Sequence, residues 1–242
     1  MQISIIIQAR TGSKRLPNKV LMKIEGKPIL EHIVNFLKFS KKTDQIIVAT
    51  SNLKSDDKIE KLCNKINVSC FRGDSLNVLK RYFDCAIKYE SDIVVRITAD
   101  NPLIDPTLVD KAIRLLINKK FDYVSNMIHP TYPEGYLVEV FTFNTLKYVY
   151  ENFNDDLSKE HVTFQLRKSP KELKIGEFFA TKTKQRPDYR LTVDYKDDLK
   201  LIKKIFSTLY KPNSFITYTS VFNYLKQHPS ILKINHKYST KT

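Results

Sequence analysis

The segment from Ala9 to Lys19 has the composition of a loop that binds phosphate. It reads ARTGSKRLPNK and contains four cations, one glycine and two hydroxyl side chains in eleven positions. Glycine lets the backbone approach a ligand, amides and hydroxyls donate hydrogen bonds, and Arg and Lys neutralise phosphate charge. The spacing matches neither a P-loop nor the dinucleotide fingerprint G-x-G-x-x-G. We predict a polyphosphate site here, with a solvated basic loop as the alternative.

Two acidic residues far apart in the sequence, Asp100 and Asp194, each follow an apolar, β-branched run. A carboxylate at the end of a strand can hold Mg²⁺, which prefers one or two carboxylates together with substrate phosphates. Structural alternatives exist for both residues. Asp100 suits an Asx turn before Pro102, and Asp194, considered alone, is better explained as the N-cap of a helix.

These residues stand at the ends of predicted strands in an alternating pattern. Four apolar, β-branched runs predict strands at residues 3–8, 45–50, 68–71 and 92–98. Amphipathic segments between them predict helices, and Asp105-Pro106 marks the start of another helix, with a cap and a proline at its first position. The pattern predicts an α/β fold of three layers (α/β/α), with a mostly parallel sheet between helices.

The pattern becomes less regular after about residue 120. Further strands are predicted at 121–125, 136–143, 173–179 and 190–193, and further helices at 144–151, 157–167, 196–209 and 214–227. We expect a single domain over residues 1–228 with a small β-arm around 127–190, followed by a C-terminal tail at 229–242. Because ligands bind beyond the carboxyl ends of parallel strands, the segments after these strands are the predicted site.

Six segments of the chain together span about residues 3–200. In order they are IIQARTGSKRLPNKVLMKIEGKPILEHIV, FRGDSLNVLKRY, RITADNPLIDP, PEGYLVEVF, KEHVT and RLTVDYKDDL. In this order they resemble the motifs of the sugar-activating cytidylyltransferases. This family includes the acylneuraminate and 3-deoxy-manno-octulosonate cytidylyltransferases, and the similarity is greatest to relatives in spore coat polysaccharide synthesis. The resemblance implies a nucleotide-diphospho-sugar transferase fold. It also implies Mg²⁺-dependent transfer of CMP from CTP to a sugar acid, sugar phosphate or related small polar acceptor, with release of pyrophosphate.

The resemblance also implies roles for individual residues. The residues implied in nucleotide binding are Ala9, Arg10, Thr11, Gly12, Ser13, Arg15, Lys19, Thr50, Ser51, Arg72 and Asp100. Those implied in catalysis are Arg10, Arg15, Lys19 and Asp100, those implied in binding Mg²⁺ are Asp100 and Asp194, and those implied in acceptor binding are Glu139, Glu160 and His161. Tyr136-Leu137 replaces the Leu-Asp pair that often follows P-x-G in the family, which leaves the acceptor open.

Two other classes of protein are alternatives to a cytidylyltransferase. A glycosyltransferase of similar fold commonly carries an Asp-x-Asp metal motif, which this sequence lacks. A nucleic-acid-binding protein is suggested by the net charge of +15, but 32 of the 41 basic residues are lysine, whereas readers of nucleic acid rely on arginine. Most of the excess, +11, lies in residues 165–242, and the strand-end acids would repel a polyanion. We expect no nucleic-acid partner.

The remaining expectations concern location and assembly. No apolar run approaches the ~20 residues of a membrane span, and the first residues read as a strand instead of a cleaved leader. The three cysteines, Cys63, Cys70 and Cys85, form neither a C-x-x-C motif nor an even set for a disulfide framework. We therefore expect a cytoplasmic protein without a membrane partner, and the resemblance implies a homodimer.

Overall fold

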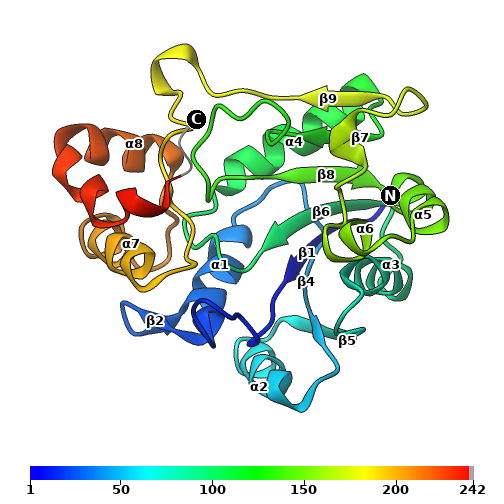
Figure 1. Cartoon of the computed structure of the whole chain (residues 1–242), viewed down its shortest axis with the longest axis horizontal. Helices are drawn as coiled ribbons and strands as arrows, with labels where there is room; N and C mark the ends of the chain where they lie inside the picture. Colours follow the sequence, from blue (N-terminus) through cyan, green and yellow to red (C-terminus); the bar gives the residue numbers. More distant parts are fainter. Residues whose placement is uncertain (240–242) are drawn as a thin grey trace.

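In the computed structural model, which describes residues 1–239, a seven-stranded sheet lies between two layers of helices (Figure 1). The strand order is β5-β4-β1-β6-β8-β7-β9. The strands are β1 (Ile3–Gln8), β4 (Gln45–Ser51), β5 (Ser69–Gly73), β6 (Ile93–Thr98), β7 (Tyr123–Ser125), β8 (Glu139–Thr142) and β9 (Ile175–Glu177). Only β8 runs against the others. The predicted α/β/α architecture with a mostly parallel sheet is confirmed.

The central strand β1 pairs with β4 on one side and β6 on the other, and its side chains alternate between two cores. Ile5 and Ile7 face one cluster, and Ile6 faces the other. All three are fully buried, because helices cover both faces of a parallel sheet. This explains why the strand reads as an unbroken apolar run.

The helices divide between the two faces of the sheet. The face of Ile5 is covered by α1 (Ile29–Leu37), α2 (Asp57–Lys65), α4 (Pro106–Lys119), α7 (Lys196–Leu209) and α8 (Tyr218–Gln227). The face of Ile6 is covered by α3 (Val78–Lys88) and α5 (Phe143–Asn152), with α6 (Asp156–Glu160) beside α3. The predicted start of α4 is confirmed, since the Asp105 carboxylate accepts a hydrogen bond from the Thr107 amide at 2.8 Å.

The region after residue 126 differs from the sequence-based expectation. β8 and β9, which fall within the residues of the expected arm at 127–190, join the main sheet. The small antiparallel pair lies instead near the N-terminus, as β2 (Lys23–Ile24) and β3 (Lys27–Pro28). The strand predicted at 190–193 is wrong, since that segment makes only one isolated bridge, between Glu134 and Arg190. Its amides instead donate to loop carbonyls: Leu191 to Glu134 and Val193 to Asp100.

The described part of the expected C-terminal tail packs onto the domain. Two 3₁₀ turns, η5 (Pro229–Ile234) and η6 (His236–Tyr238), follow α8, and η5 contacts both α7 and α8. Asn235 between them is buried. The last three residues of that segment, 240–242, lie outside the described chain. Within residues 1–239, no helix has the length and apolar character needed to cross a membrane.

Candidate active site

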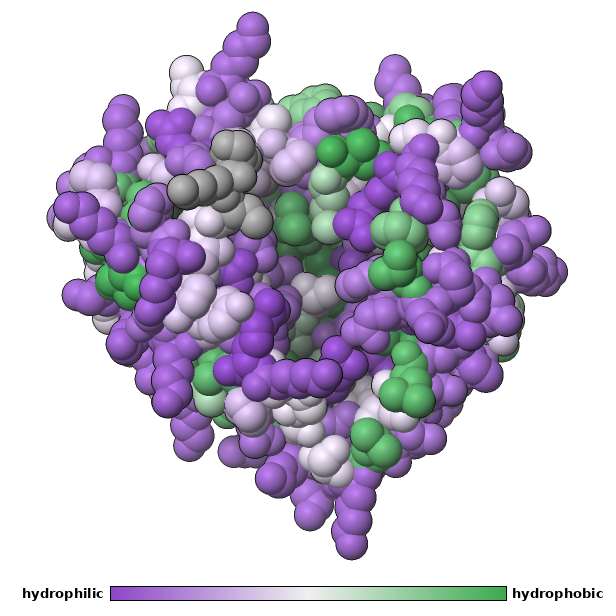
Figure 2. All heavy atoms as spheres, in the orientation of Figure 1, coloured by the Kyte–Doolittle hydropathy of each residue, from purple (hydrophilic) through white to green (hydrophobic). Residues whose placement is uncertain are grey.

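A cleft of about 660 Å³ opens at the carboxyl ends of β1 and β6. The face drawn in Figure 2 is hollowed near its centre, and hydrophilic side chains border much of the hollow. The sequence-predicted residues that line the cleft are Arg10, Gly12, Ser13, Arg15, Lys19, Asp100, Glu160, His161 and Asp194. Residues from the basic loop, β6, α6 and the segment before α7 therefore meet at one place.

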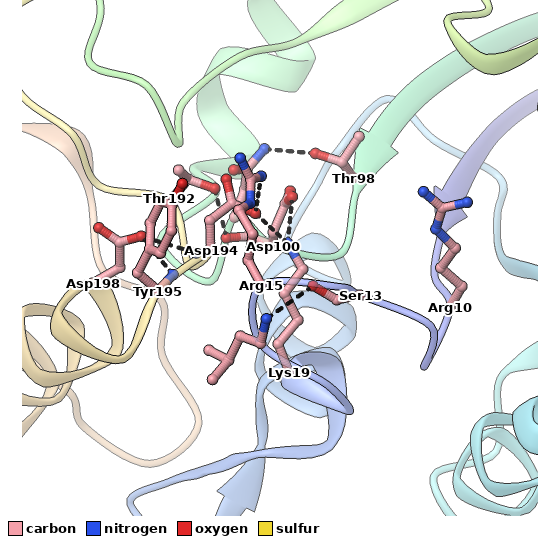
Figure 3. A network of polar contacts seen from close by, with 12 residues as sticks. Arg10, Ser13, Arg15, Lys19, Thr98, Asp100, Thr192, Asp194, Tyr195 and Asp198 are labelled. Carbon is pink, nitrogen blue, oxygen red and sulfur yellow. Dashed lines mark hydrogen bonds and ion pairs between the residues drawn. The ribbon is translucent and has the colours of Figure 1, made fainter. Parts of the chain in front are cut away.

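Asp100 and Asp194 converge on a single cation at this cleft. The Lys19 ammonium nitrogen donates to Asp100 Oδ2 at 2.9 Å and to Asp194 Oδ1 at 2.8 Å (Figure 3). Two carboxylates that share one cation at these distances suit Mg²⁺, which takes one or two carboxylates and completes its shell with phosphate and water. Among residues 1–239, no cluster of three or more metal-ligating side chains occurs, so the substrate would have to supply the remaining ligands.

The two acids meet because the segment before α7 is tied to the end of β6. The amide of Val193 donates to the Asp100 carbonyl at 2.8 Å, and the Thr192 hydroxyl donates to the same oxygen at 3.1 Å. These bonds fix the backbone on both sides of the site. The N-cap alternative for Asp194 does not hold, since the N-cap of α7 is Tyr195.

A buried ion network holds the Asp194 carboxylate in place. The Arg190 guanidinium contacts Asp194 at 2.9 Å, Asp198 at 3.2 Å and Glu134 at 2.6 Å. Burial alone would raise the pKa of Asp194, but hydrogen bonds and charge from Lys19, Arg190 and Arg15 outweigh it and lower the pKa to about 2. Asp194 is therefore a carboxylate at neutral pH, as a metal ligand must be.

Asp198 lies beneath this network and shapes the backbone above it. It is fully buried, and its Oδ2 accepts hydrogen bonds from the amides of Asp194 and Tyr195, each at 2.9 Å. The same carboxylate completes a capping box at the start of α7. One side chain thus starts the helix and orients the loop that carries Asp194.

Gly135 allows the Glu134 loop to approach this segment. Its φ is +112°, and an added Cβ would lie 2.5 Å from the Leu191 carbonyl oxygen. We expect Gly135→Ala to lower the free energy of unfolding by more than about 2 kcal/mol, because both the backbone angle and the contact exclude a side chain. Urea denaturation measures this. Gly12→Ala is the matched control, since nothing lies within 4 Å of its added Cβ, and equal losses in both variants would contradict the argument.

Hydrogen bonds to Asp56 shape the start of the basic loop. The Asp56 carboxylate accepts from the Thr11 amide at 2.8 Å, from the Thr11 hydroxyl at 2.6 Å and from the Ser51 hydroxyl at 2.5 Å. Burial acts to raise the pKa of Asp56, but these bonds dominate and lower it. Thr11 and Ser51 were expected to bind nucleotide. The structure instead uses both to fix the loop, and neither lines the cleft.

The other residues expected on the nucleotide side are also turned away from the cleft. Ala9 and Thr50 are buried. Arg72 pairs with Asp57 at 2.6 Å and with Glu60 at 2.9 Å, two acids on α2 that hold its guanidinium against the outer edge of the sheet. The structure therefore does not bring Ala9, Thr50 or Arg72 to the predicted site.

The residues expected to bind the acceptor separate into two groups. Glu160 and His161 line the cleft, and Glu160 pairs with Arg10 at 3.0 Å. Arg10 lies apart from the cluster of Arg15, Lys19 and the two acids (Figure 3).

Glu139 does not reach the cleft. Its side chain is 2% exposed, contacts Arg96 at 2.5 Å and accepts from the Tyr123 hydroxyl at 2.5 Å. Burial acts to raise the pKa of Glu139, yet the charge of Arg96 and these hydrogen bonds lower it. Glu139 therefore supports Arg96, and its side chain is not among those that line the cleft.

Arg96 is a charged residue of the site that sequence reasoning missed. It lines the cleft floor, its Nη2 donates to Gln8 Oε1 at 3.3 Å, and its buried Nε has no hydrogen-bond partner among the described residues. The signal was available, because Arg96 is the one charged residue in strand β6, whose other residues are apolar except for Thr98. A cation inside a buried strand needs a partner or a ligand.

A second hollow of about 710 Å³ lies between α1, α2 and the end of α7. Its lining combines lysines, such as Lys38 and Lys65, with apolar side chains such as Phe36. It is far from the strand-end acids in the fold and has no paired carboxylates, so the chemistry points to the first cleft.

Comparison with known proteins identifies the family of the chain. The sequence pattern that defines the cytidylyltransferases matches residues 4–234. The chain belongs to the cytidylyltransferase family. A solved cytidylyltransferase of this family, from Leptospira borgpetersenii, is 30% identical and superimposes with a TM-score of 0.91, covering 100% of this chain and 98% of its own. The suspected family is thereby confirmed.

Two curated relatives are similar to the chain, one named for polysaccharide biosynthesis and one named as a cytidylyltransferase. The spore coat polysaccharide biosynthesis protein SpsF of Bacillus subtilis is 32% identical over 84% of this chain and 86% of its own length. A 3-deoxy-manno-octulosonate cytidylyltransferase of Francisella tularensis is 33% identical over 73% of this chain and 71% of its own length. Family membership makes the chain a nucleotidyltransferase.

Proposed function

We propose that this protein transfers CMP from CTP to a small polar acceptor of surface-glycan synthesis and releases pyrophosphate. The observation that carries the proposal is the convergence of Asp100 and Asp194 on the Lys19 ammonium, next to the basic loop. This arrangement joins a metal-binding carboxylate pair to a phosphate-binding segment. The names of the two curated relatives support the choice of CTP and of a glycan precursor.

In the proposed reaction an acceptor oxygen attacks the α-phosphorus of CTP in line. A new P–O bond forms to the acceptor, the bond to the β-phosphate oxygen breaks, and pyrophosphate leaves with that electron pair. Arg15 and Lys19 neutralise the charge that develops on the leaving group. Arg10 lines the cleft apart from these two cations. Mg²⁺ held by Asp100 and Asp194 would supply Lewis-acid stabilisation of phosphate charge.

The acceptor side of the cleft supports a substrate with an anionic group. This region is lined by Arg96, Glu160 and His161. The Arg96 guanidinium is paired with the buried Glu139 carboxylate, which does not line the cleft. A carboxylate or phosphate on the acceptor could accept a hydrogen bond from the Arg96 guanidinium. Glu160 and His161 offer hydrogen bonds to hydroxyl groups of the acceptor.

The Arg96–Glu139 pair offers a test of acceptor binding. We expect the double variant Arg96→Gln/Glu139→Gln to raise the acceptor KM by roughly ten- to a hundredfold, while the CTP KM changes by less than about threefold. Changing both residues avoids leaving one buried charge unpaired. Initial rates of pyrophosphate release measure both constants. The matched control Lys14→Gln removes a cation that also lines the cleft, and an equal rise in its acceptor KM would contradict a specific role.

The proposed function is tested by a screen for pyrophosphate release. Four nucleoside triphosphates are crossed with keto-acid sugars and phosphorylated sugars, with Mg²⁺ and with a chelator in its place. We expect turnover with CTP and Mg²⁺ and none with the chelator. Absence of turnover with any triphosphate, or turnover independent of metal, would contradict the proposal. Nucleotide sugars as donors test the glycosyltransferase alternative.

Assembly and location stay predictions within this proposal. The homodimer implied by the family resemblance is checked by light scattering on the purified full chain. A cytoplasmic location is checked by fractionation of cells that express it. The acceptor, once identified by the screen, would indicate which glycan the protein serves.

A further inference from the structure

The C-terminal segment, residues 229–238, lies directly behind the metal-binding loop. It consists of η5, Asn235 and η6, and it packs against α7, the helix that follows Asp194. In Figure 1 this red end of the chain lies beside α7 and α8. We propose that this segment positions Asp194 and Arg15, so that it is a working part of the active site although it contributes no residue to the cleft.

The first contact runs through Asn235, which is 2% exposed. Its side-chain amide donates to Asp198 Oδ1 at 2.8 Å and to the Arg190 carbonyl at 2.9 Å. Asp198 in turn accepts from the backbone amides of Asp194 and Tyr195. Asn235 therefore holds both ends of the loop 190–198, because it bonds to the residue that begins the loop and the one that closes it.

A neutral amide suits this position better than any charged group. Asp198 already has a charged partner in Arg190, whose guanidinium also serves Asp194. A second cation beside Asp198 would compete with Arg190 and loosen its contact with Asp194. The asparagine instead fills the remaining acceptor site on Asp198 with a donor that adds no charge.

The second contact runs through Tyr238, whose ring stacks on Tyr195 at 3.9 Å between centroids and 4° between planes. Tyr195 follows Asp194 and is the N-cap of α7. The Arg15 guanidinium carbon lies 5.1 Å from the centre of the Tyr195 ring, and Arg15 pairs with Asp194 at 2.8 Å. Arg15 is 53% exposed, and within residues 1–239 the groups recorded against its guanidinium are the Asp194 carboxylate and the Tyr195 ring.

The two contacts lead to Asp194, proposed to bind the metal, and to Arg15, proposed to bind phosphate. Without Asn235 the loop 190–198 loses two side-chain hydrogen bonds, and without Tyr238 the ring beneath Arg15 loses its stacking partner. We expect Asn235→Ala to speed amide hydrogen exchange in residues 190–198 about tenfold, with little change in strands β1 and β4. This part of the inference concerns the protein without ligand.

The consequence for ligand binding rests on the proposed function. We expect Asn235→Ala and Tyr238→Ala each to weaken binding of CTP with Mg²⁺ about tenfold, measured by calorimetry on the full chain. Tyr238→Phe keeps the stacked ring and should bind as the unaltered protein does. Lys233→Ala, an exposed change in the same segment, is the matched control for both measurements.

The two measurements separate the inference from the proposed function. If the unaltered protein binds no CTP, the proposed function is wrong, and hydrogen exchange still decides whether the segment orders the loop. If Asn235→Ala exchanges at 190–198 as slowly as the unaltered protein, the inference is overturned. It is equally overturned if exchange rises uniformly over the whole chain, or if CTP binding stays within twofold in both alanine variants.

Discussion

Replacing Asp100 with asparagine should lower the rate of pyrophosphate release about a thousandfold and leave the fold intact. Asparagine has the same shape but no charge, so the carboxylate pair with Asp194 is lost. Losing one group that stabilises developing charge in a transition state typically costs two to three orders of magnitude, or about 3–4 kcal/mol. The fold should survive because Lys19 keeps its second partner, Asp194, at 2.8 Å.

Turnover is measured with saturating CTP over a range of Mg²⁺ concentrations, and thermal unfolding is measured in parallel. The control is Glu151→Gln, which removes an exposed carboxylate that pairs with Lys147 on α5, outside the cleft. The control should retain turnover within about twofold, as expected for an exposed ion pair. Full activity of Asp100→Asn would show that the metal and phosphate chemistry lies elsewhere.

Replacing Arg190 with methionine should lower the free energy of unfolding by about 3–5 kcal/mol. Arg190 is 8% exposed and is the shared partner of Glu134, Asp194 and Asp198. Methionine keeps much of the volume but leaves Glu134 and the fully buried Asp198 without a cation, whereas Asp194 keeps Lys19 and Arg15. Removing one partner from a buried ion network costs this much because an uncompensated charge remains.

Urea denaturation at neutral pH measures this loss. Arg72→Met is a matched control, since Arg72 also binds two acids, Asp57 and Glu60, but both are 41% exposed. Solvent screens such pairs, so we expect the control to lose less than about 1 kcal/mol. Similar losses in the two variants would mean that burial does not set the strength of the Arg190 network.

Local sequence signals predicted the parallel half of the fold well. Apolar runs such as 3–8 and 92–98 became strands with nearly the predicted bounds, because burial on both faces favours apolar, β-branched residues. The Asp105-Pro106 pair marked the start of α4 because a cap and a proline act within one turn. The same signals failed at 190–193, where hydrogen bonds to distant loops replace a strand ladder.

Site residues that directly follow a strand were predicted from the sequence. Those whose position depends on strand order were not. Lys19 and Asp100 follow β1 and β6, and their placement in one cleft agrees with the rule for parallel strands. Asp194 reaches the same cleft from a loop that is hydrogen-bonded to the segment after β6. Glu139 was misplaced because β8 runs antiparallel and pairs in register with β6, which sets Glu139 opposite Arg96. Strand order and register are long-range properties, and no local pattern in the sequence reports that pairing.

The position of Lys19 has a consequence for the order in which ligands enter. Its ammonium occupies the point toward which both carboxylates are directed, so an ion that enters alone competes with a tethered cation at high effective concentration. A triphosphate offers Lys19 another anion and brings its own ion. In the proposed reaction this arrangement would favour the metal–nucleotide complex over free metal. After pyrophosphate departs, the Lys19 ammonium would again neutralise both carboxylates.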